Sequence, residues 1–230
     1  MNFLFEGLKE AVNILLSFDE GFLTIVWVSL KVSFLAILSA TMIGVPLGVF
    51  LSFKCFPGQK IVINMLHTLM SAPTVVIGLT VYAMLSRQGP LGQWELLYTQ
   101  PAMILGQMLL ALPIIASLTI TAVRNLDKRV QMTVASLGAT PFQELKMLFH
   151  EASYGILAAI IAGYARVFSE IGISMMLGGN IKGYTRNITT AIALETGKGE
   201  FSVSLALGII LLIAAFLINF LFSSIQKQAK

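Results

Sequence analysis

The segment Leu137-Gly138-Ala139-Thr140-Pro141-Phe142 decides how this chain is organised. It lies within a polar stretch, 124–151, that is preceded and followed by long apolar segments. The charged residues around it are Arg124, Asp127, Lys128, Arg129, Glu144 and Lys146. An amphipathic stretch between two apolar segments has to emerge at one surface of a membrane. It therefore predicts a protrusion that docks a partner or, alternatively, a helix that rests on lipid headgroups.

The composition of the chain places it in a membrane. Of its 230 residues 57% are hydrophobic and 11% are charged, and the mean hydropathy is +0.86. A chain of this kind cannot form a water-soluble globule. The formal net charge is only +4, and the basic residues are scattered over loops, which argues against nucleic acid as a partner. The single cysteine, Cys55, excludes an intramolecular disulfide and a thiolate zinc cluster.

Five apolar stretches are long enough to cross about 30 Å of hydrocarbon, which takes roughly 20 helical residues. They cover residues 22–53, 61–86, 101–123, 154–177 and 203–222. The first exceeds the required length, so we expect it to tilt, project or bend, with Pro46 as the place for a bend. Small residues inside the spans, such as Gly44, Gly48 and Gly163, predict close helix packing. The predicted fold is all-α, a single polytopic helical bundle over 1–230.

Lysine and arginine counts predict the orientation of the bundle. One set of loops and ends holds Lys54, Lys60, Arg124, Lys128, Arg129, Lys146, Lys227 and Lys230, and the opposite set holds Lys9, Arg87, Lys182, Arg186 and Lys198. The positive-inside rule places the stretch 124–151 and the C-terminus in the cytoplasm, and the N-terminus and segment 178–202 outside. Residues 1–20 predict an amphipathic helix at the surface of the cell membrane, in contact with membrane lipid, or alternatively a loosely ordered terminus.

The polar stretch 124–151 has the local signals of a helical turn. It predicts two short helices that meet near residues 139–141. Gly138 permits close approach where the helices meet, Thr140 is suited to cap the second helix, and Pro141 is suited to its first turn.

Three runs of sequence resemble a known family. Met132-Thr133-Val134-Ala135-Ser136-Leu137-Gly138-Ala139-Thr140-Pro141-Phe142 resembles the cytoplasmic signature loop of ABC-importer permeases, in which an E-A-A triplet precedes x-x-L-G-A-[ST]. Ala72-Pro73-Thr74-Val75-Val76-Ile77-Gly78-Leu79 with Gly89-Pro90-Leu91-Gly92 is similar to the P-P-V-V-x-G-L…G-P-L-G pattern of molybdate-type permeases. Phe168-Ser169-Glu170-Ile171-Gly172 with Gly178-Gly179-Asn180-Ile181 is similar to their E-[FIV]-G…G-G-N-I region.

The segment Thr185-Arg186-Asn187-Ile188-Thr189-Thr190-Ala191-Ile192 resembles most the tungstate branch of that oxyanion family. The resemblance covers nearly the whole chain, from about residue 24 to residue 222, and its motifs occur in the family's order. The chain departs from the pattern at Met132, which stands where the triplet has its acidic residue, and at His150-Glu151, which replace the usual L-P.

The resemblance implies a type I ABC importer permease-like fold, with about five transmembrane helices and a cytoplasmic coupling helix. It implies two copies of a separate ABC ATPase subunit and an extracytoplasmic oxyanion-binding protein as partners, and tungstate or molybdate as the substrate. The residues that would contact the ATPase are Ala135, Leu137, Gly138, Ala139, Thr140, Pro141 and Phe142. No G-x-x-x-x-G-K-[ST] motif occurs, so the chain is not expected to hydrolyse ATP. Five spans are few for enclosing a polar route, which favours a homodimer.

A doubly charged anion cannot cross hydrocarbon unaided, so polar groups have to line its route. The candidates for this translocation pathway are Ser71, Pro73, Thr74, Gly78, Arg166 and Glu170. Further polar residues inside the spans are Thr41, Thr80, Gln107, Ser117, Thr119, Ser169 and Ser174. Arg166 and Glu170 share one helix face at a spacing of four residues. They form either an ion pair that fixes helix packing, which we favour, or a site where Arg166 attracts the anion and Glu170 limits its affinity.

The outer segment 178–202 is predicted to form an external gate, with Asn180, Arg186, Thr189 and Thr190 as its residues, or to be an ordinary long loop. His67 and His150 lack a second ligand at helical spacing, and no catalytic set of side chains stands out, so neither a metal, a cofactor nor an enzyme is expected. The alternatives that stay open are a permease for another small solute and a passive anion channel.

Overall fold

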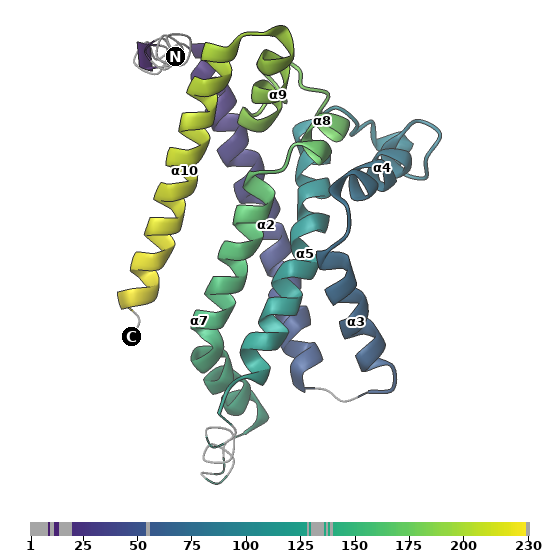
Figure 1. Ribbon diagram of the computed structural model, residues 1–230. Helices are drawn as coiled ribbons and strands as arrows, with labels where there is room; N and C mark the ends of the chain where they lie inside the picture. The colour runs from purple at the N-terminus through teal and green to yellow at the C-terminus, as the bar shows by residue number, and fades with distance from the viewer. Residues whose placement is uncertain are drawn as a thin grey trace.

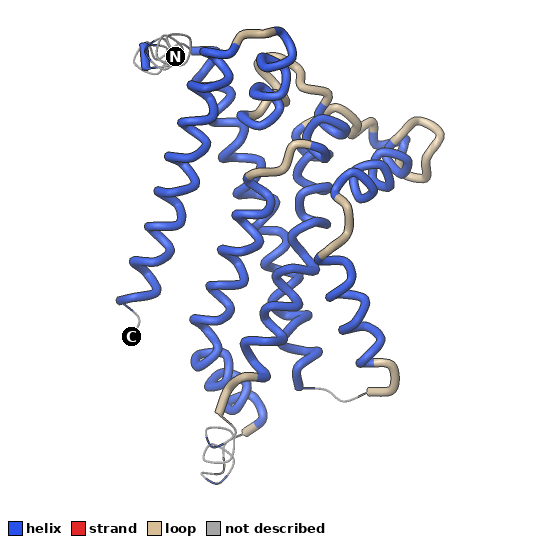
Figure 2. Tube along the Cα trace, viewed as in Figure 1, coloured by secondary structure: helices blue, strands red, loops and turns tan. Residues whose placement is uncertain are grey.

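The computed structural model describes residues 20–53, 56–127 and 140–228, together with residues 9, 12, 13, 129, 136 and 138. In these parts of the chain every regular element is a helix (Figure 2). Four helices are long and apolar enough to cross a membrane, and a bent pair of shorter helices adds a fifth crossing if it is one span. The predicted all-α bundle of about five spans is confirmed.

The long helices lie side by side and form the body of the molecule (Figure 1). They are α2 (Glu20–Phe53), α5 (Gln100–Arg124), α7 (Pro141–Phe168) and α10 (Phe201–Gln228). Helix α5 is central, because it packs against α2, α7 and three of the shorter helices. Helix α2 continues through Pro46, and its 34 residues are about 51 Å long at 1.5 Å per residue, so it projects beyond the hydrocarbon.

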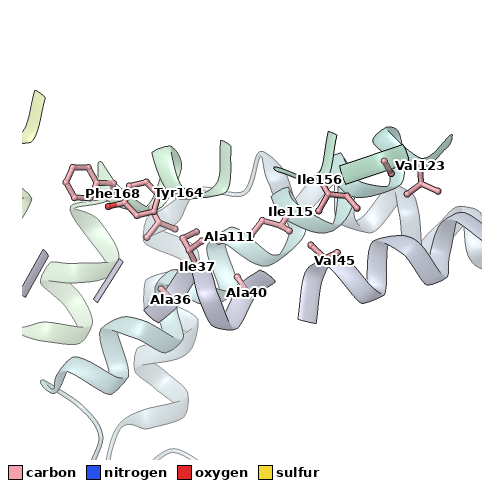
Figure 3. Close-up of a cluster of buried hydrophobic side chains, with 12 residues drawn as sticks. Ala36, Ile37, Ala40, Val45, Ala111, Ile115, Val123, Ile156, Tyr164 and Phe168 are labelled. Carbon is pink, nitrogen blue, oxygen red and sulfur yellow. The ribbon is translucent and has the colours of Figure 1, made fainter. Parts of the chain in front are cut away.

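Small residues allow these helices to approach one another closely. Buried side chains from α2, α5 and α7 form the main apolar cluster, in which alanines alternate with larger residues (Figure 3). A Cβ placed on Gly48 would lie 2.7 Å from the carbonyl oxygen of Ala116. A Cβ on Gly163 would lie 2.9 Å from Cγ1 of Ile115, and one on Gly44 would lie 3.3 Å from Cβ of the same residue. The predicted packing role of these glycines is confirmed.

Two of the predicted spans are broken. The stretch 61–86 forms α3 (Gln59–Met70) and α4 (Thr74–Leu85), whose axes differ by 104°, so this predicted span is not one straight helix. Pro73 explains the break, because proline has no N–H to donate and the residue before it avoids helical geometry. The stretch 154–177 is also interrupted, since α7 ends at Phe168 and the short helix α8 (Gly172–Gly178) follows.

The polar stretch 124–151 differs in part from its prediction. Thr140 caps α7 as predicted: its Oγ1 accepts from the Gln143 N–H at 3.4 Å, and its own N–H donates to Gln143 Oε1 at 2.8 Å. Pro141 occupies the first turn. The second of the two expected short helices is not separate, because no proline follows Pro141 and α7 continues to Phe168. The first short helix, most of residues 1–20, and Ala135, Leu137 and Ala139 lie outside the described residues.

The connecting segments lie at two opposite ends of the bundle (Figure 1). One end holds α8, α9 (Ile188–Lys198), the 3-10 turn η1 (Gly92–Trp94) and the N-terminal side of α2. The other end holds the end of α2, the start of α3, the end of α5 and the start of α7. This alternation is what five crossings require, and it separates the two sets of basic loops.

Candidate functional site

The two broken spans meet at one place, which we call the break junction: residues 71–78 and 166–173. A Cβ placed on Gly172 would lie 3.2 Å from Oε1 of Glu170 and 3.7 Å from Oγ1 of Thr74. A Cβ on Gly78 would lie 3.6 Å from Cα of Ile173. Helices α4 and α8 therefore pack closely against each other at these two glycines. The structure brings four pathway candidates together here, Thr74, Gly78, Glu170 and, through its ion pair, Arg166.

Glu170 is the best-satisfied polar side chain of the break junction. The residue is 4% exposed. Its Oε1 accepts from the N–H groups of Gly172 at 2.9 Å and Ile173 at 3.4 Å, and its Oε2 lies 3.0 Å from Nη1 of Arg166. A buried carboxylate is tolerated only with such partners. The ion pair expected from the spacing of four residues is present.

The other groups of the break junction are more open. The side chain of Arg166 is 40% exposed, against 5% for that of Glu170. Ser71 and Pro73 are exposed and Thr74 is half-buried. Hydroxyls, a guanidinium and the uncapped start of α4 can contact an anion without holding it tightly. In the described residues no group of three histidines, cysteines or carboxylates is placed to hold a metal ion.

A buried polar network connects the break junction to α5 and α9. Oγ of Ser174 accepts from Nε2 of Gln107 at 3.1 Å and from Nδ2 of Asn187 at 3.0 Å. Oγ1 of Thr189 lies 2.9 Å from the carbonyl oxygen of Glu170. All of these side chains are at most 4% exposed. The network holds the outer segment and the break junction together as one packed unit.

The outer segment 178–202 is partly helical, because α9 has a well-formed start. The side chain of Asn187 accepts from the Thr190 N–H at 2.9 Å, and the Asn187 N–H donates to Thr190 Oγ1 at 3.1 Å. The Ile188 N–H donates to Oγ of Ser29 on α2 at 2.7 Å. An asparagine before the apolar turn of a helix is a known start signal, so the start of α9 could have been predicted from the sequence.

The four gate candidates therefore lie in two environments. Thr189 and Thr190 are 4% and 0% exposed and belong to the buried start of α9. Asn180 and Arg186 are partly exposed, and Nη2 of Arg186 lies 3.5 Å from the carbonyl oxygen of Asn180. Asn187 was not among the gate candidates, although its side chain caps α9 and donates to Ser174. Its link to Ser174 depends on tertiary packing and leaves no signal in the sequence.

The η1 segment is joined to this outer end of the bundle. The Tyr98 N–H donates to the carbonyl oxygen of Leu177 at 2.8 Å, and the hydroxyls of Tyr82 and Tyr98 are 3.3 Å apart. The hydrogen bond between the two hydroxyls raises the pKa of Tyr98 above its ordinary value, which keeps the phenol neutral.

An apolar groove of about 890 Å³ lies between α2, α7 and α10. Trp27, Phe34, Leu38, Ile160 and Ile218 are among its lining residues, and its polar members are Lys31, Thr41 and Tyr164. A wall of this chemistry suits acyl chains. Its one cation, Nζ of Lys31, already donates to Oε1 of Gln100 at 3.0 Å, so the groove offers little to a doubly charged anion. The break junction, and not this groove, is therefore the candidate site.

Comparisons with known proteins identify the family. No protein-family model matches the sequence. The chain is 37% identical over 228 residues to the tungstate uptake system permease protein TupB of Peptoclostridium acidaminophilum, which covers 99% of this chain and 100% of that one. The chain belongs to the ABC transporter permease family that includes this tungstate uptake permease. The permease is also 39% identical over 197 residues to a probable anion ABC transporter permease protein of Haloferax volcanii, over 84% of this chain and 85% of that one.

A solved structure resembles the fold of the permease at low sequence identity. A chain of a bacterial alginate ABC transporter, solved in complex with an alginate pentasaccharide-bound periplasmic protein, gives a TM-score of 0.77 at 16% identity and covers 99% of this chain and 88% of that chain. The expected type I ABC importer permease-like fold is confirmed.

Proposed function

We propose that this permease moves a tetrahedral oxyanion, tungstate or molybdate, into the cell as the transmembrane subunit of an ATP-driven importer. The observation that carries the proposal is full-length identity of 37% to a tungstate uptake permease. The break junction supports it, because polar groups inside two apolar spans are rare and usually functional. Ser71, Pro73, Thr74 and Gly78 belong to one side of that junction, and Arg166 and Glu170 to the other.

The proposed assembly contains two copies of the permease, two ATPase subunits and an external oxyanion-binding protein. A phosphate-binding loop is absent from the sequence, so ATP has to be hydrolysed by another chain. A pair related by a twofold axis would enclose a route between the copies and present two equivalent docking loops. The external protein would engage the end that holds α8, α9, Asn180 and Arg186.

Helix α7 provides a direct mechanical link in this proposal. It begins at Pro141, which is itself one of the proposed docking residues, and ends at Phe168, at the break junction. Its 28 residues are about 42 Å long at 1.5 Å per residue. A rigid helix transmits a displacement along its length. ATPase closure at the loop would therefore shift the position of Arg166 and Glu170 against α4.

Uptake of labelled tungstate into proteoliposomes tests the proposed function. With the ATPase and the binding protein present, we expect accumulation that requires ATP and is competed by molybdate. Uptake that persists without ATP would favour the passive channel, and ATP-driven uptake of an unrelated solute in place of both oxyanions would favour a permease for that solute.

We propose that the end holding the α5–α7 segment is cytoplasmic. The test uses two exposed lysines at opposite ends, Lys146 and Lys182, each changed to cysteine in a Cys55→Ser background. In intact cells an impermeant maleimide is expected to label Lys182→Cys and to leave Lys146→Cys unlabelled, with the reverse in inside-out vesicles. Labelling of Lys146→Cys in intact cells would contradict the orientation and the docking role of the loop.

A further inference from the structure

The ion pair of Arg166 and Glu170 is asymmetric. Both carboxylate oxygens of Glu170 already have partners, and the side chain is only 5% exposed. Arg166 uses one N–H group for the pair while 40% of its side chain is exposed. A guanidinium carries five N–H donors, so it keeps several for another acceptor. Only the cation of the pair is available at the surface.

The surface around Arg166 does not have the character of a lipid-facing one. The exposed residues on its helix face, Ala158, Ala162, Ala165 and Ser169, are small or polar. The lipid-type faces of the bundle instead present large apolar side chains, such as Phe216 at 74% exposure. A charged group directed into lipid is costly. This face of α7 is therefore suited to water or to a second copy of the chain.

The broken backbone leads to the same conclusion. Residues 169–171 interrupt a predicted span, and Ser169 and Ile171 are exposed in the single chain. Irregular backbone at membrane depth occurs only where it is covered by protein or lines a water-filled cavity. Ser71 and Pro73, at the break between α3 and α4, are exposed in the same way.

We infer that Arg166 is the cation which the oxyanion meets on the pathway wall, and that Glu170 is a positioning residue that holds the guanidinium without meeting the anion. The inference rests on the proposed function and gives the two charged residues of its site different roles. The flat fork of a guanidinium matches the oxygens of a tetrahedral oxyanion. The buried charge of Glu170 weakens that hold, so the anion can leave again. The second copy supplies the equivalent arginine on the facing wall.

Local charge at this surface can be measured without transport. In a Cys55→Ser background the assembled transporter carries Ala165→Cys, which leaves the ion pair intact. Its reaction rates with an anionic and a cationic methanethiosulfonate of similar size are compared. Arg166→Gln is expected to lower the anionic-to-cationic rate ratio by about threefold or more, and Arg166→Lys to restore it, because one unit charge changes the local potential. Glu170→Gln is expected to raise the ratio, since the arginine loses its counter-charge.

A pair hidden from the aqueous pathway would leave the ratio unchanged in both variants, and that result would overturn the inference. Opposite changes would show that Arg166 and Glu170 both act on the potential of this surface, and the uptake measurement tests whether the anion meets the arginine. A matched control is Phe216→Cys on α10, whose lipid-facing thiol is expected to react at least about tenfold more slowly, because thiolates do not form in hydrocarbon. If Ala165→Cys reacts as slowly as Phe216→Cys, the inference is overturned.

Tungstate uptake completes the test. Arg166→Gln is expected to lower ATP-driven uptake by about tenfold, the loss typical of a charge-assisted hydrogen bond, while Arg166→Lys retains most of it. Unchanged uptake in Arg166→Gln would overturn the inference. If the unaltered transporter takes up no tungstate at all, the proposed function fails, and that result is distinct because it precedes any substitution.

Discussion

Gly138→Arg is expected to abolish ATP-driven tungstate uptake while the bundle still folds. Gly138 has a φ of +73°, and a Cβ on it would meet nothing within 4 Å among the described residues. A side chain there is free to project into whatever docks on the loop. A long charged side chain would therefore separate the permease from its ATPase. Coupling between two sites typically changes the binding affinity at one of them by about 5–150-fold, so we expect the rate of uptake to fall by at least about tenfold. Uptake and co-purification with the ATPase are the measurements.

The matched control for this prediction is Gly58→Arg. Gly58 has a φ of +91° and is equally free of neighbours, and it lies in the α2–α3 connection at the same end of the molecule. The two variants therefore share the cost of a left-handed backbone, about 1–2 kcal/mol for a residue with a side chain. We expect Gly58→Arg to retain uptake. Equal loss in both variants would mean that strain, and not docking, is responsible.

Among the substitutions proposed for this permease, Gly48→Leu is expected to lower the free energy of unfolding the most. A β-carbon on Gly48 would lie 2.7 Å from the carbonyl oxygen of Ala116 and 2.7 Å from Cβ of Thr119, and neither atom is able to move aside. A leucine would push α2 away from α5 and disturb the main apolar cluster. Overpacking of this kind costs about 1–3 kcal/mol, and the rigid contacts here place the variant at the upper end. The midpoint of thermal unfolding in detergent is the measurement.

Gly208→Leu on α10 is the control for that substitution. Gly208 is also helical, but a Cβ there would meet nothing within 4 Å. It gains the same apolar volume in the same kind of helix, so we expect an unchanged or higher midpoint. Equal destabilisation of the two variants would show that the contact of α2 with α5 is looser than the structure indicates.

The hydrophobic lengths in the sequence were sufficient to predict the architecture. A bilayer has a fixed thickness, so runs of apolar residues translate directly into spans, and α2, α5 and α10 lie where they were expected. Thr140 and Pro141 were equally readable, because caps are local chemistry. The bend before Thr74 was missed, although Pro73 stands at that position. Hydropathy is averaged over a window of many residues, so a break of only a few residues does not change it.

The candidate site was only partly predictable. The spacing of four residues indicated the pair of Arg166 and Glu170, since both side chains share a helix face. The sequence could not tell which of the two side chains would be buried, and the different roles that we propose for them depend on this. Ser174, Asn187 and Gln107 were separate polar residues until folding brought them together.

The sequence by itself determined that this chain is a membrane bundle with a polar loop between its third and fourth spans, because hydropathy and caps act over short distances along the chain. Only the tertiary structure decided that the two broken spans meet, that Glu170 is enclosed by the start of α8, and that Arg166 stays partly exposed. Those facts depend on contacts between residues far apart in the chain, where packing and the satisfaction of buried polar groups select one arrangement.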